Sequence, residues 1–295
     1  MVEKELPLVS IIAIAYNHEQ FLKDTLDSVL NQTYPNIELI IIDSASSDSS
    51  AARIQDWVKD KSLPIQTVFH QDRRSITQNA NVGLQLAKGK YYQILSCDDN
   101  LEPEKIKNQV EVFLHSDEKL AMVYCDAVKI DDKGFHLPEP TFFEERAWQV
   151  ESQLPSGSIF PILLQDYFIV APTVLVDLEK VRELGGYDEH SMMEDLDIFL
   201  RLSQLYSFKG IYYTGVQYRV LQTSLLRATS VDTRQRNRLY LYSRFLGQKG
   251  EWDRFIAYQF LLFKKDSGLF YQMIYSVHRL LNRVLVKRLK SSFRN

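Results

Sequence analysis

The sequence predicts an α/β fold in which a mainly parallel sheet is flanked by helices, followed by a C-terminal helical extension. Short apolar runs have the length and β-branched content of buried strands. Segments with helical periodicity alternate with these runs, an order that implies parallel pairing through right-handed crossovers. Polar residues directly follow several of the strands, and in open α/β sheets that edge binds ligands.

The composition is that of a globular protein with a sizeable core, since 45% of the 295 residues are hydrophobic and 25% are charged. The two cysteines, Cys97 and Cys125, lack metal-ligand spacing, which indicates a reducing compartment. The acidic N-terminus leads straight into a strand, so we expect no signal peptide. No apolar run approaches the roughly 18 residues of a membrane span. These features favour a cytoplasmic protein.

Four strands and the helices between them account for the first half of the chain. We expect strands at 9–15, 38–43, 66–70 and 91–95, and helices at 21–30, 54–58, 76–87 and 104–114. Parallel strands end at one edge of a sheet, where this order would bring together Tyr16, Asp43, the segment 71–74 and the pair Asp98 and Asp99. A single ligand could touch all of them.

The pair Asp98 and Asp99 follows the apolar run 91–95 directly. Two neighbouring carboxylates repel each other, and a divalent cation or a hydroxyl that binds them relieves the repulsion. Asp-Asp-Asn is also ordinary turn chemistry. Taken alone, the pair therefore fits either a ligand site or a simple turn.

The second half of the chain is less regular. We expect a strand at 121–126, a turn at 131–134, and loops near the ligand over 135–158, where Trp148 could stack on a ligand ring but is preferred as a structural residue. A helix at 178–184 ends at a pair of glycines. Glu194 and Asp195 then fall in the first turn of the next helix, where the helix dipole alone already favours carboxylates.

The charges are unevenly distributed along the chain. Residues 1–230 hold 21 lysines and arginines against 34 acidic residues, a net charge of −13, whereas residues 231–295 hold 14 against 4, a net charge of +10. The end of the chain has the pattern of a basic amphipathic helix. An acidic body with a basic tail suggests that residues 265–295 face an anionic membrane surface. Since the basic face lacks interleaved aromatic residues, we expect no nucleic-acid partner.

Six sequence blocks occur in a set order over roughly residues 8–227. They are 9–12 with Tyr16 and Asn17, 27–34, 40–44, 81–83, 96–99 with Pro103, and 185–189 with Glu194 and Asp195. Together they resemble the family 2 glycosyltransferases, which are inverting enzymes of the GT-A fold that use sugar nucleotides. The resemblance implies a catalytic domain over 1–230, with a donor half at about 8–126 and an acceptor half at about 127–230. The basic helical extension would then occupy 231–295.

The resemblance also implies roles for individual residues on the donor side. Tyr16 would pack on the nucleotide base, Asp98 would hold the ribose, and Asp99 would bind a Mn²⁺ or Mg²⁺ ion that bridges the diphosphate. Such an ion stabilises the charge that develops on the leaving diphosphate. The full set of expected donor-binding residues is Tyr16, Asn17, Asp43, Ser44, Arg74 and Asp98, with Arg73 as the alternative to Arg74 for the phosphate contact.

On the acceptor side, Asp195 matches the general base of the family and Glu194 would orient the acceptor. Asp195 would take the proton from the acceptor hydroxyl as that oxygen attacks the anomeric carbon, with inversion. The implied reaction moves a hexosyl or N-acetylhexosaminyl unit from a nucleoside diphosphate sugar, preferentially a UDP-sugar. The acceptor would be a surface polysaccharide or a lipid-linked glycan, and the enzyme would lie on the inner face of the membrane.

Four positions depart from the family pattern: Ser44 replaces a second acid, Ser96 replaces an aspartate, Ala80 replaces an arginine, and Leu221 replaces a histidine. They motivate a rival interpretation, a non-catalytic subunit that binds a sugar nucleotide or a glycan. A dinucleotide-dependent oxidoreductase is excluded, because the loop 16–20 has none of the glycines such a site requires.

Overall fold

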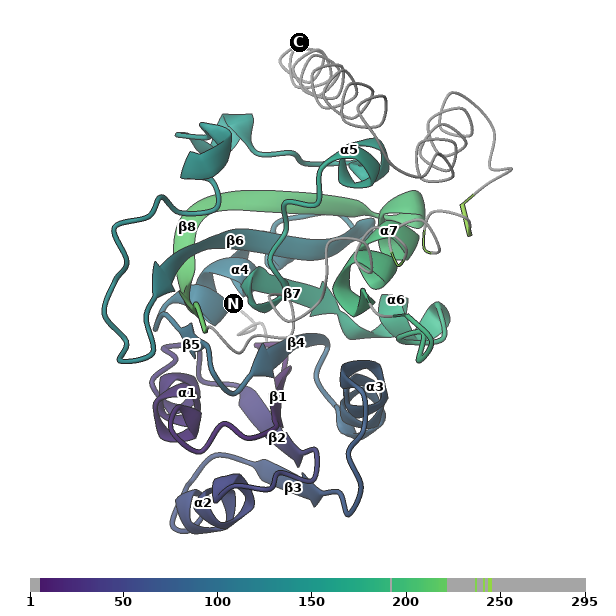
Figure 1. The fold of residues 1–295 in the computed structure, drawn as a ribbon. Helices are drawn as coiled ribbons and strands as arrows, with labels where there is room; N and C mark the ends of the chain where they lie inside the picture. Colours follow the sequence, from purple (N-terminus) through teal and green to yellow (C-terminus); the bar gives the residue numbers. More distant parts are fainter. Residues whose placement is uncertain (1–5, 192, 222–236, 238–240, 242–243, 246–295) are drawn as a thin grey trace, which may run out of the picture.

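One mixed eight-stranded sheet forms the centre of the computed structural model, which describes residues 6–191, 193–221, 237, 241, 244 and 245 (Figure 1). The strands are β1 Val9–Ala15, β2 Ile37–Asp43, β3 Ile65–Phe69, β4 Tyr91–Ser96, β5 Asn100–Leu101, β6 Leu120–Ile130, β7 Val174–Asp177 and β8 Ser207–Arg219. The helices are α1 Leu22–Leu30, α2 Ser50–Trp57, α3 Ile76–Leu86, α4 Lys105–Leu114, α5 Phe160–Gln165, α6 Leu178–Glu183 and α7 Glu194–Leu205.

The strand order is β3-β2-β1-β4-β7-β6-β8-β5. The first four of these are parallel, as the alternation of strands and helices predicts, whereas β7 is antiparallel to both of its neighbours. Ala15 pairs with Asp43, and Ile14 with Ser96, so β1, β2 and β4 end level with one another. The predicted polar residues therefore leave the sheet at one edge.

All seven residues of β1 are buried, which confirms a central strand covered on both faces. Ile12 and Ile14 face the apolar layer that contains α3, α5, α6 and α7, while Ile11 and Ala13 face the layer that contains α1, α2 and α4. Figure 1 shows α1 and α2 on one side of the sheet and α3 on the other. Helix α3 lies very close to the sheet, because a Cβ on Gly83 would be 2.3 Å from Ile12 Cγ2.

The irregular segment between β6 and β7 contains two short 3-10 helices, Glu144–Arg146 and Glu151–Gln153. Trp148 is a structural residue, the preferred of its two interpretations, and not a stacking platform for a ligand. Its side chain is 3% exposed and packs edge-on against Phe143 and Phe168, with ring centres 5.6 and 5.2 Å apart. Phe143, Trp148 and Phe168 of this segment build the core, because burying them removes a large apolar area from water.

Both cysteines, Cys97 and Cys125, are free and buried. Among the described residues, no helix combines the length and hydropathy needed to cross a membrane. Leu241 and Phe245, from the predicted extension, are buried in the core layer that contains α5 and α7. The prediction of a basic amphipathic helix within residues 265–295 lies outside the described residues.

Lys105 is fully buried at the start of α4, directly behind the end of β4. Its Nζ donates to Gln93 Oε1 at 2.6 Å and to Gln109 Oε1 at 2.7 Å. Both amides are held in that orientation, because their Nε2 groups donate to backbone carbonyls. Burial lowers the pKa of Lys105 to about 8, so the ammonium remains protonated at neutral pH.

We expect Lys105→Met to lower the free energy of unfolding by about 2 to 4 kcal/mol, because it leaves two buried amide oxygens without donors. Urea denaturation at pH 7 measures this loss. Lys107→Met is the matched control, since Lys107 lies on the same helix with an exposed side chain paired to Glu104. The control should leave the urea midpoint nearly unchanged. Equal midpoints for the two variants would show that the buried network contributes no stability.

Candidate active site

The loops after β1 and β2 are tied together at the carboxyl edge of the sheet. Asn17 has a φ of +56° and its Oδ1 accepts a hydrogen bond from the Ser47 amide at 2.8 Å. The Asp43 carboxylate is buried and accepts from the hydroxyl and the amide of Ser46, at 2.6 and 3.0 Å. The bonds of Asn17 to Ser47 tie the two loops together, and the bonds from Ser46 hold the Asp43 carboxylate in place.

Ser44 is buried beside Asp43, and the protein itself uses the hydrogen-bonding capacity of its hydroxyl. Oγ donates to the Arg74 carbonyl and accepts from the Arg74 amide and from Asn79 Nδ2, each at 3.0 Å. The Arg74 side chain is exposed, and the Arg73 guanidinium lies 4.2 Å from the centre of the Tyr16 ring. The structure therefore places Ser44 as the anchor of the loop that carries both arginines.

Asp98 and Asp99 lie at the end of β4, as the sequence predicts. Asp99 is 4% exposed, and its Oδ1 accepts from the Arg219 amide at 2.8 Å. The side chain of Asp98 is partly exposed, with Oδ2 3.9 Å from His18 Nε2. Burial, with a smaller contribution from the charge of Asp98, holds the pKa of Asp99 well above its usual range. A nearby cation would reverse this shift.

Arg219, at the end of β8, is a residue whose importance the sequence alone does not reveal. Its guanidinium is buried, donates to the carbonyls of Asp98 and Asp131 at 2.8 Å each, and lies 4.7 Å from the centre of the Phe21 ring. It therefore fixes the backbone of the acidic pair. Residues 130 and 219 pair across β6 and β8, a long-range contact that no local pattern signals.

The fit of a divalent cation depends on how many oxygen ligands the protein offers. Within the described residues, no group of three or more His, Cys, Asp or Glu side chains could hold a metal ion. Asp98 and Asp99 offer two neighbouring carboxylates. A Mg²⁺-type ion commonly takes only one or two carboxylates from the protein and completes its coordination with phosphate oxygens and water. Asp98 and Asp99 have the ligand chemistry for such an ion if phosphate oxygens or water complete its coordination.

A cleft of about 620 Å³ opens at this edge of the sheet. Its lining residues come from the segments that follow β1, β2, β6 and β8. Of the site residues that the sequence predicts within the described chain, the lining includes Asn17 alone. The other lining residues are Glu19, Gln20, Phe21, Asp48, Asp131, Asp132, Leu137, Glu139, Val220 and Leu221. The cleft wall is acidic, so an anionic group would need a cation to enter it.

Glu194 and Asp195 begin α7, as predicted. Asp195 Oδ1 accepts from the Leu196 amide at 2.7 Å, and Oδ2 accepts a hydrogen bond from the hydroxyl of Tyr167. Burial raises the pKa of Asp195 to about 6, and it also raises the pKa of Glu194. A carboxyl with a pKa near 6 is ionised at neutral pH and basic enough to take a proton. Tyr167 is a second residue that the sequence analysis missed.

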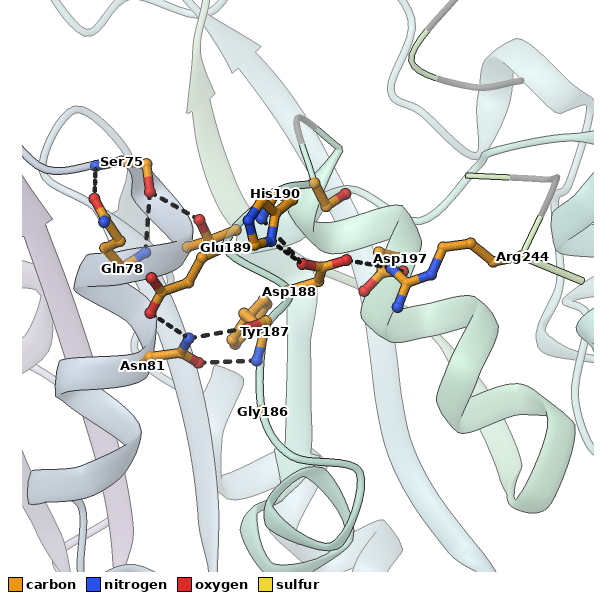
Figure 2. A network of polar contacts seen from close by, with 12 residues as sticks. Ser75, Gln78, Asn81, Gly186, Tyr187, Asp188, Glu189, His190, Asp197 and Arg244 are labelled. Atoms are coloured by element: carbon orange, nitrogen blue, oxygen red, sulfur yellow. Dashed lines mark hydrogen bonds and ion pairs between the residues drawn. The ribbon is translucent and has the colours of Figure 1, made fainter. Parts of the chain in front are cut away.

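The turn that precedes α7 is bound to helix α3 (Figure 2). Asn81 Oδ1 accepts from the Tyr187 amide, and Asn81 Nδ2 donates to the Tyr187 carbonyl, both at 2.9 Å. Nδ2 also donates to Glu189 Oε1 at 3.2 Å. The Tyr187 hydroxyl lies 3.0 Å from the hydroxyl of Tyr92 in β4. Two of the six sequence blocks thus meet in space.

The structure brings the predicted residues together in two groups. The first group follows the carboxyl ends of β1, β2 and β4 or lies on the neighbouring loop, and it contains Tyr16, Asn17, Asp43, Ser44, Arg74, Asp98 and Asp99. The second group, Glu194 and Asp195, lies at the start of α7. No hydrogen bond between the described residues joins Asp195 to Asp98 or Asp99. The two groups are connected through Asn81 and the turn at Tyr187.

Comparison with known sequences identifies relatives over most of the chain. The family model described as "Glycosyl transferase family 2" matches residues 10–170, more than half of the protein. A glycosyltransferase of Haemophilus influenzae is 36% identical over 215 residues, covering 72% of this chain and 80% of its own. TuaG of Bacillus subtilis, whose name assigns it to teichuronic acid biosynthesis, is 29% identical over 74% of this chain and 81% of its own.

Other relatives are longer than the matched region. A glycosyltransferase of Rickettsia typhi is 31% identical over 204 residues, which cover 68% of this chain and 61% of that protein. The chain therefore spans less than two thirds of the length of this relative.

Two solved structures share the fold. The mannosyltransferase PcManGT from Pyrobaculum calidifontis, in complex with GDP-Man and Mn²⁺, superposes with a TM-score of 0.61 at 16% identity and covers 97% of this chain and 85% of its own. TarS from S. aureus, in complex with UDP-GlcNAc, gives a TM-score of 0.63 at 14% identity, with 87% and 71% covered. These neighbours show the GT-A fold. With the family match over residues 10–170, they establish that the chain is a member of glycosyltransferase family 2.

Proposed function

We propose that this protein is a metal-dependent, inverting glycosyltransferase that moves a hexosyl or N-acetylhexosaminyl unit from a nucleoside diphosphate sugar to an acceptor hydroxyl. The observation that carries the proposal is the environment of Asp195. This carboxylate accepts a hydrogen bond from the hydroxyl of Tyr167, and its pKa is raised to about 6. An acceptor hydroxyl would make the same contact with a general base.

The donor would bind at the ends of β1, β2 and β4. Tyr16 would pack on the base, Asp43 would lie beside it, and Asp98 would hold the ribose. Ser44 supports this site indirectly, because its hydroxyl fixes the loop of Arg73 and Arg74. These arginines carry positive charge that suits a diphosphate. The UDP-GlcNAc and GDP-Man complexes of the two structural neighbours support a nucleoside diphosphate sugar, and a UDP-sugar is our first choice.

Asp99 would hold a Mn²⁺ or Mg²⁺ ion, which when bound would stabilise the negative charge that develops on the leaving diphosphate. The Mn²⁺ in the PcManGT complex supports this assignment. Arg219 fixes the backbone around Asp98 and Asp99 through its bond to the Asp98 carbonyl. The acidic pair would therefore present its oxygens to the ion without rearrangement.

Asp195 would take the proton from the acceptor hydroxyl as that oxygen attacks the anomeric carbon from the face opposite the diphosphate. The C–O bond to the acceptor forms, the bond to the diphosphate oxygen breaks, and the configuration inverts. The Tyr167 hydroxyl would yield its place on Asp195 to the acceptor. Glu194, in the same first helical turn, would orient the acceptor through its carboxyl group.

The product would be a surface polysaccharide or a lipid-linked glycan, made at the inner face of the membrane. The name of TuaG supports polysaccharide assembly. The net charge of +10 over residues 231–295 supports an anionic membrane surface as a partner of the tail. Leu241 and Phe245 pack on the core layer that contains α5 and α7. This contact is compatible with membrane binding by residues 265–295.

A non-catalytic subunit that binds a sugar nucleotide is the second candidate. Two observations favour it. The Ser44 hydroxyl is already bonded to Arg74 and Asn79, and Ser96 and Leu221 replace residues that are typical of the family. The carboxylates of Asp99 and Asp195 argue for turnover, because a binding protein has no need of a base with a pKa near 6.

We expect nucleoside diphosphate sugars to stabilise the protein in the presence of Mn²⁺. At a ligand concentration of 100 times Kd the gain is about 2.7 kcal/mol, which corresponds to a Tm increase of roughly 5 to 10 °C. Asp99→Asn should abolish the Mn²⁺-dependent part of the shift. Asp56→Asn, an exposed change on α2, should keep it. If neither UDP-sugars nor GDP-sugars raise the Tm with Mn²⁺, the protein is not a sugar-nucleotide enzyme.

We expect kcat/KM to fall tenfold per pH unit below about pH 6, because protonated Asp195 cannot act as a base. Asp195→Asn should lower kcat by about 10²- to 10⁴-fold. It should not lower the Tm at pH 7.5: the raised pKa means that the ionised form costs stability above pH 6, and asparagine removes that cost. Initial rates and thermal unfolding measure both effects.

Glu179→Gln, an exposed change on α6, serves as the control and should keep the wild-type rate. A variant Asp195→Asn that retains both the rate and the acid limb of the profile would exclude Asp195 as the base.

We expect removal of residues 265–295 to weaken binding to vesicles that contain phosphatidylserine by at least tenfold, because each basic residue near anionic headgroups contributes on the order of 1 kcal/mol. Co-sedimentation measures the binding, and vesicles of phosphatidylcholine alone give the reference. Unchanged sedimentation after the truncation would show that the tail is not the membrane-binding element.

A further inference from the structure

Arg244 links the C-terminal segment to the part of the chain that presents Asp195 (Figure 2). Its Nη1 donates to Asp188 Oδ2 at 2.5 Å and to Asp197 Oδ1 at 2.9 Å. Asp188 belongs to the turn before α7, and Asp197 lies in α7 itself, two residues after Asp195. One guanidinium nitrogen therefore joins three elements: the turn, the helix and the C-terminal segment.

These charges balance only when Arg244 is in place. The Asp197 side chain is 1% exposed, and its Oδ2 accepts from Arg201 Nε at 2.8 Å. Arg201 also donates to the carbonyls of Leu184 and Gly186, at 3.1 and 2.7 Å. Two carboxylates thus face two guanidinium groups. Loss of Arg244 would leave one negative charge uncompensated beside a buried carboxylate, which is costly.

An apolar contact also links Phe245, the neighbour of Arg244, to α5, the helix that precedes Tyr167. Phe245 is buried, and the centre of its ring lies 5.5 Å from that of Phe160, the first residue of α5. Helix α5 ends at Gln165, two residues before Tyr167, which donates to Asp195. Residues 244 and 245 therefore contact both supports of Asp195, α7 by an ion pair and α5 by aromatic packing.

We propose that Arg244 is a positioning residue for Asp195, so that its ion pairs with Asp188 and Asp197 set the geometry of proton removal from the acceptor. The proposal rests on the proposed function. Arg244 does not touch the substrate; it acts through Asp188 and Asp197. Its removal should therefore change the chemical step and leave the donor site at β1, β2 and β4 intact.

We expect Arg244→Ala to lower kcat by about 10- to 100-fold, in line with the cost of small misplacements of a catalytic group. The KM for the donor and the Kd for the nucleoside diphosphate, measured by titration calorimetry, should change less than twofold. Arg244→Lys should recover most of kcat, because a single nitrogen makes both contacts and an ammonium can replace it. Arg53→Ala, an exposed change on α2, should behave as wild type.

A double-mutant cycle separates the ion pair from a general loss of charge. If Arg244 acts through Asp188, Asp188→Asn combined with Arg244→Ala should lower kcat no further than Arg244→Ala alone. Additive losses would overturn this route. The whole proposal is overturned if Arg244→Ala retains kcat within twofold of wild type, or if its loss of kcat is matched by an equal loss of donor affinity.

Amide hydrogen exchange tests the link without any turnover. Arg244→Ala should speed exchange over residues 194–198, whereas Arg244→Lys and Arg53→Ala should not. If no donor or acceptor gives transfer by the wild-type protein, the proposed function fails, and the exchange result alone decides whether the link exists. Unchanged exchange in Arg244→Ala overturns the link even in an active enzyme.

Discussion

The two hydrogen bonds between the Asn81 amide and the backbone of Tyr187 join α3 to the turn before α7, and they link the two groups of predicted site residues. Asn81 lies in α3, which packs on β1 and β2. Tyr187 lies in the turn that leads into α7 and Asp195. A Cβ on Gly186 would be 2.8 Å from Asn81 Oδ1, so the close approach requires glycine there. Gly83 permits the matching approach of α3 to Ile12 in β1.

The two carboxylate sites differ in the groups that surround them. Asp99 is buried beside Asp98, and burial together with the charge of Asp98 raises its pKa in the absence of a cation. Asp195 is a single carboxyl at a helix N-terminus, where burial raises its pKa and a tyrosine hydroxyl already occupies one oxygen. Burial therefore raises the pKa of both carboxyls, and the difference lies in the partner: a second carboxylate beside Asp99 and a tyrosine hydroxyl on Asp195.

The supporting residues come from distant parts of the chain, and each contacts a backbone or a carboxylate of the site. Arg219 holds the carbonyl of Asp98, Tyr167 holds Asp195, and Arg244 holds Asp197. No local pattern in the sequence predicts these three contacts, because each joins residues far apart in the chain. Trp148 shows the converse case, since an aromatic residue in an irregular segment looked available to a ligand and instead fills the core.

The sequence by itself determined the parallel arrangement of β1 to β4, because apolar strands alternating with periodic helices admit few other pairings. It also determined that Asp43, Asp98 and Asp99 leave the sheet at one edge, since side chains after parallel strands must emerge there. Only the tertiary structure decided that Tyr167 donates to Asp195 and that the Ser44 hydroxyl bonds to Arg74 and Asn79. It also decided that β8 brings the Arg219 guanidinium to the Asp98 carbonyl. These contacts join residues far apart in the chain, and local propensity carries no information about them.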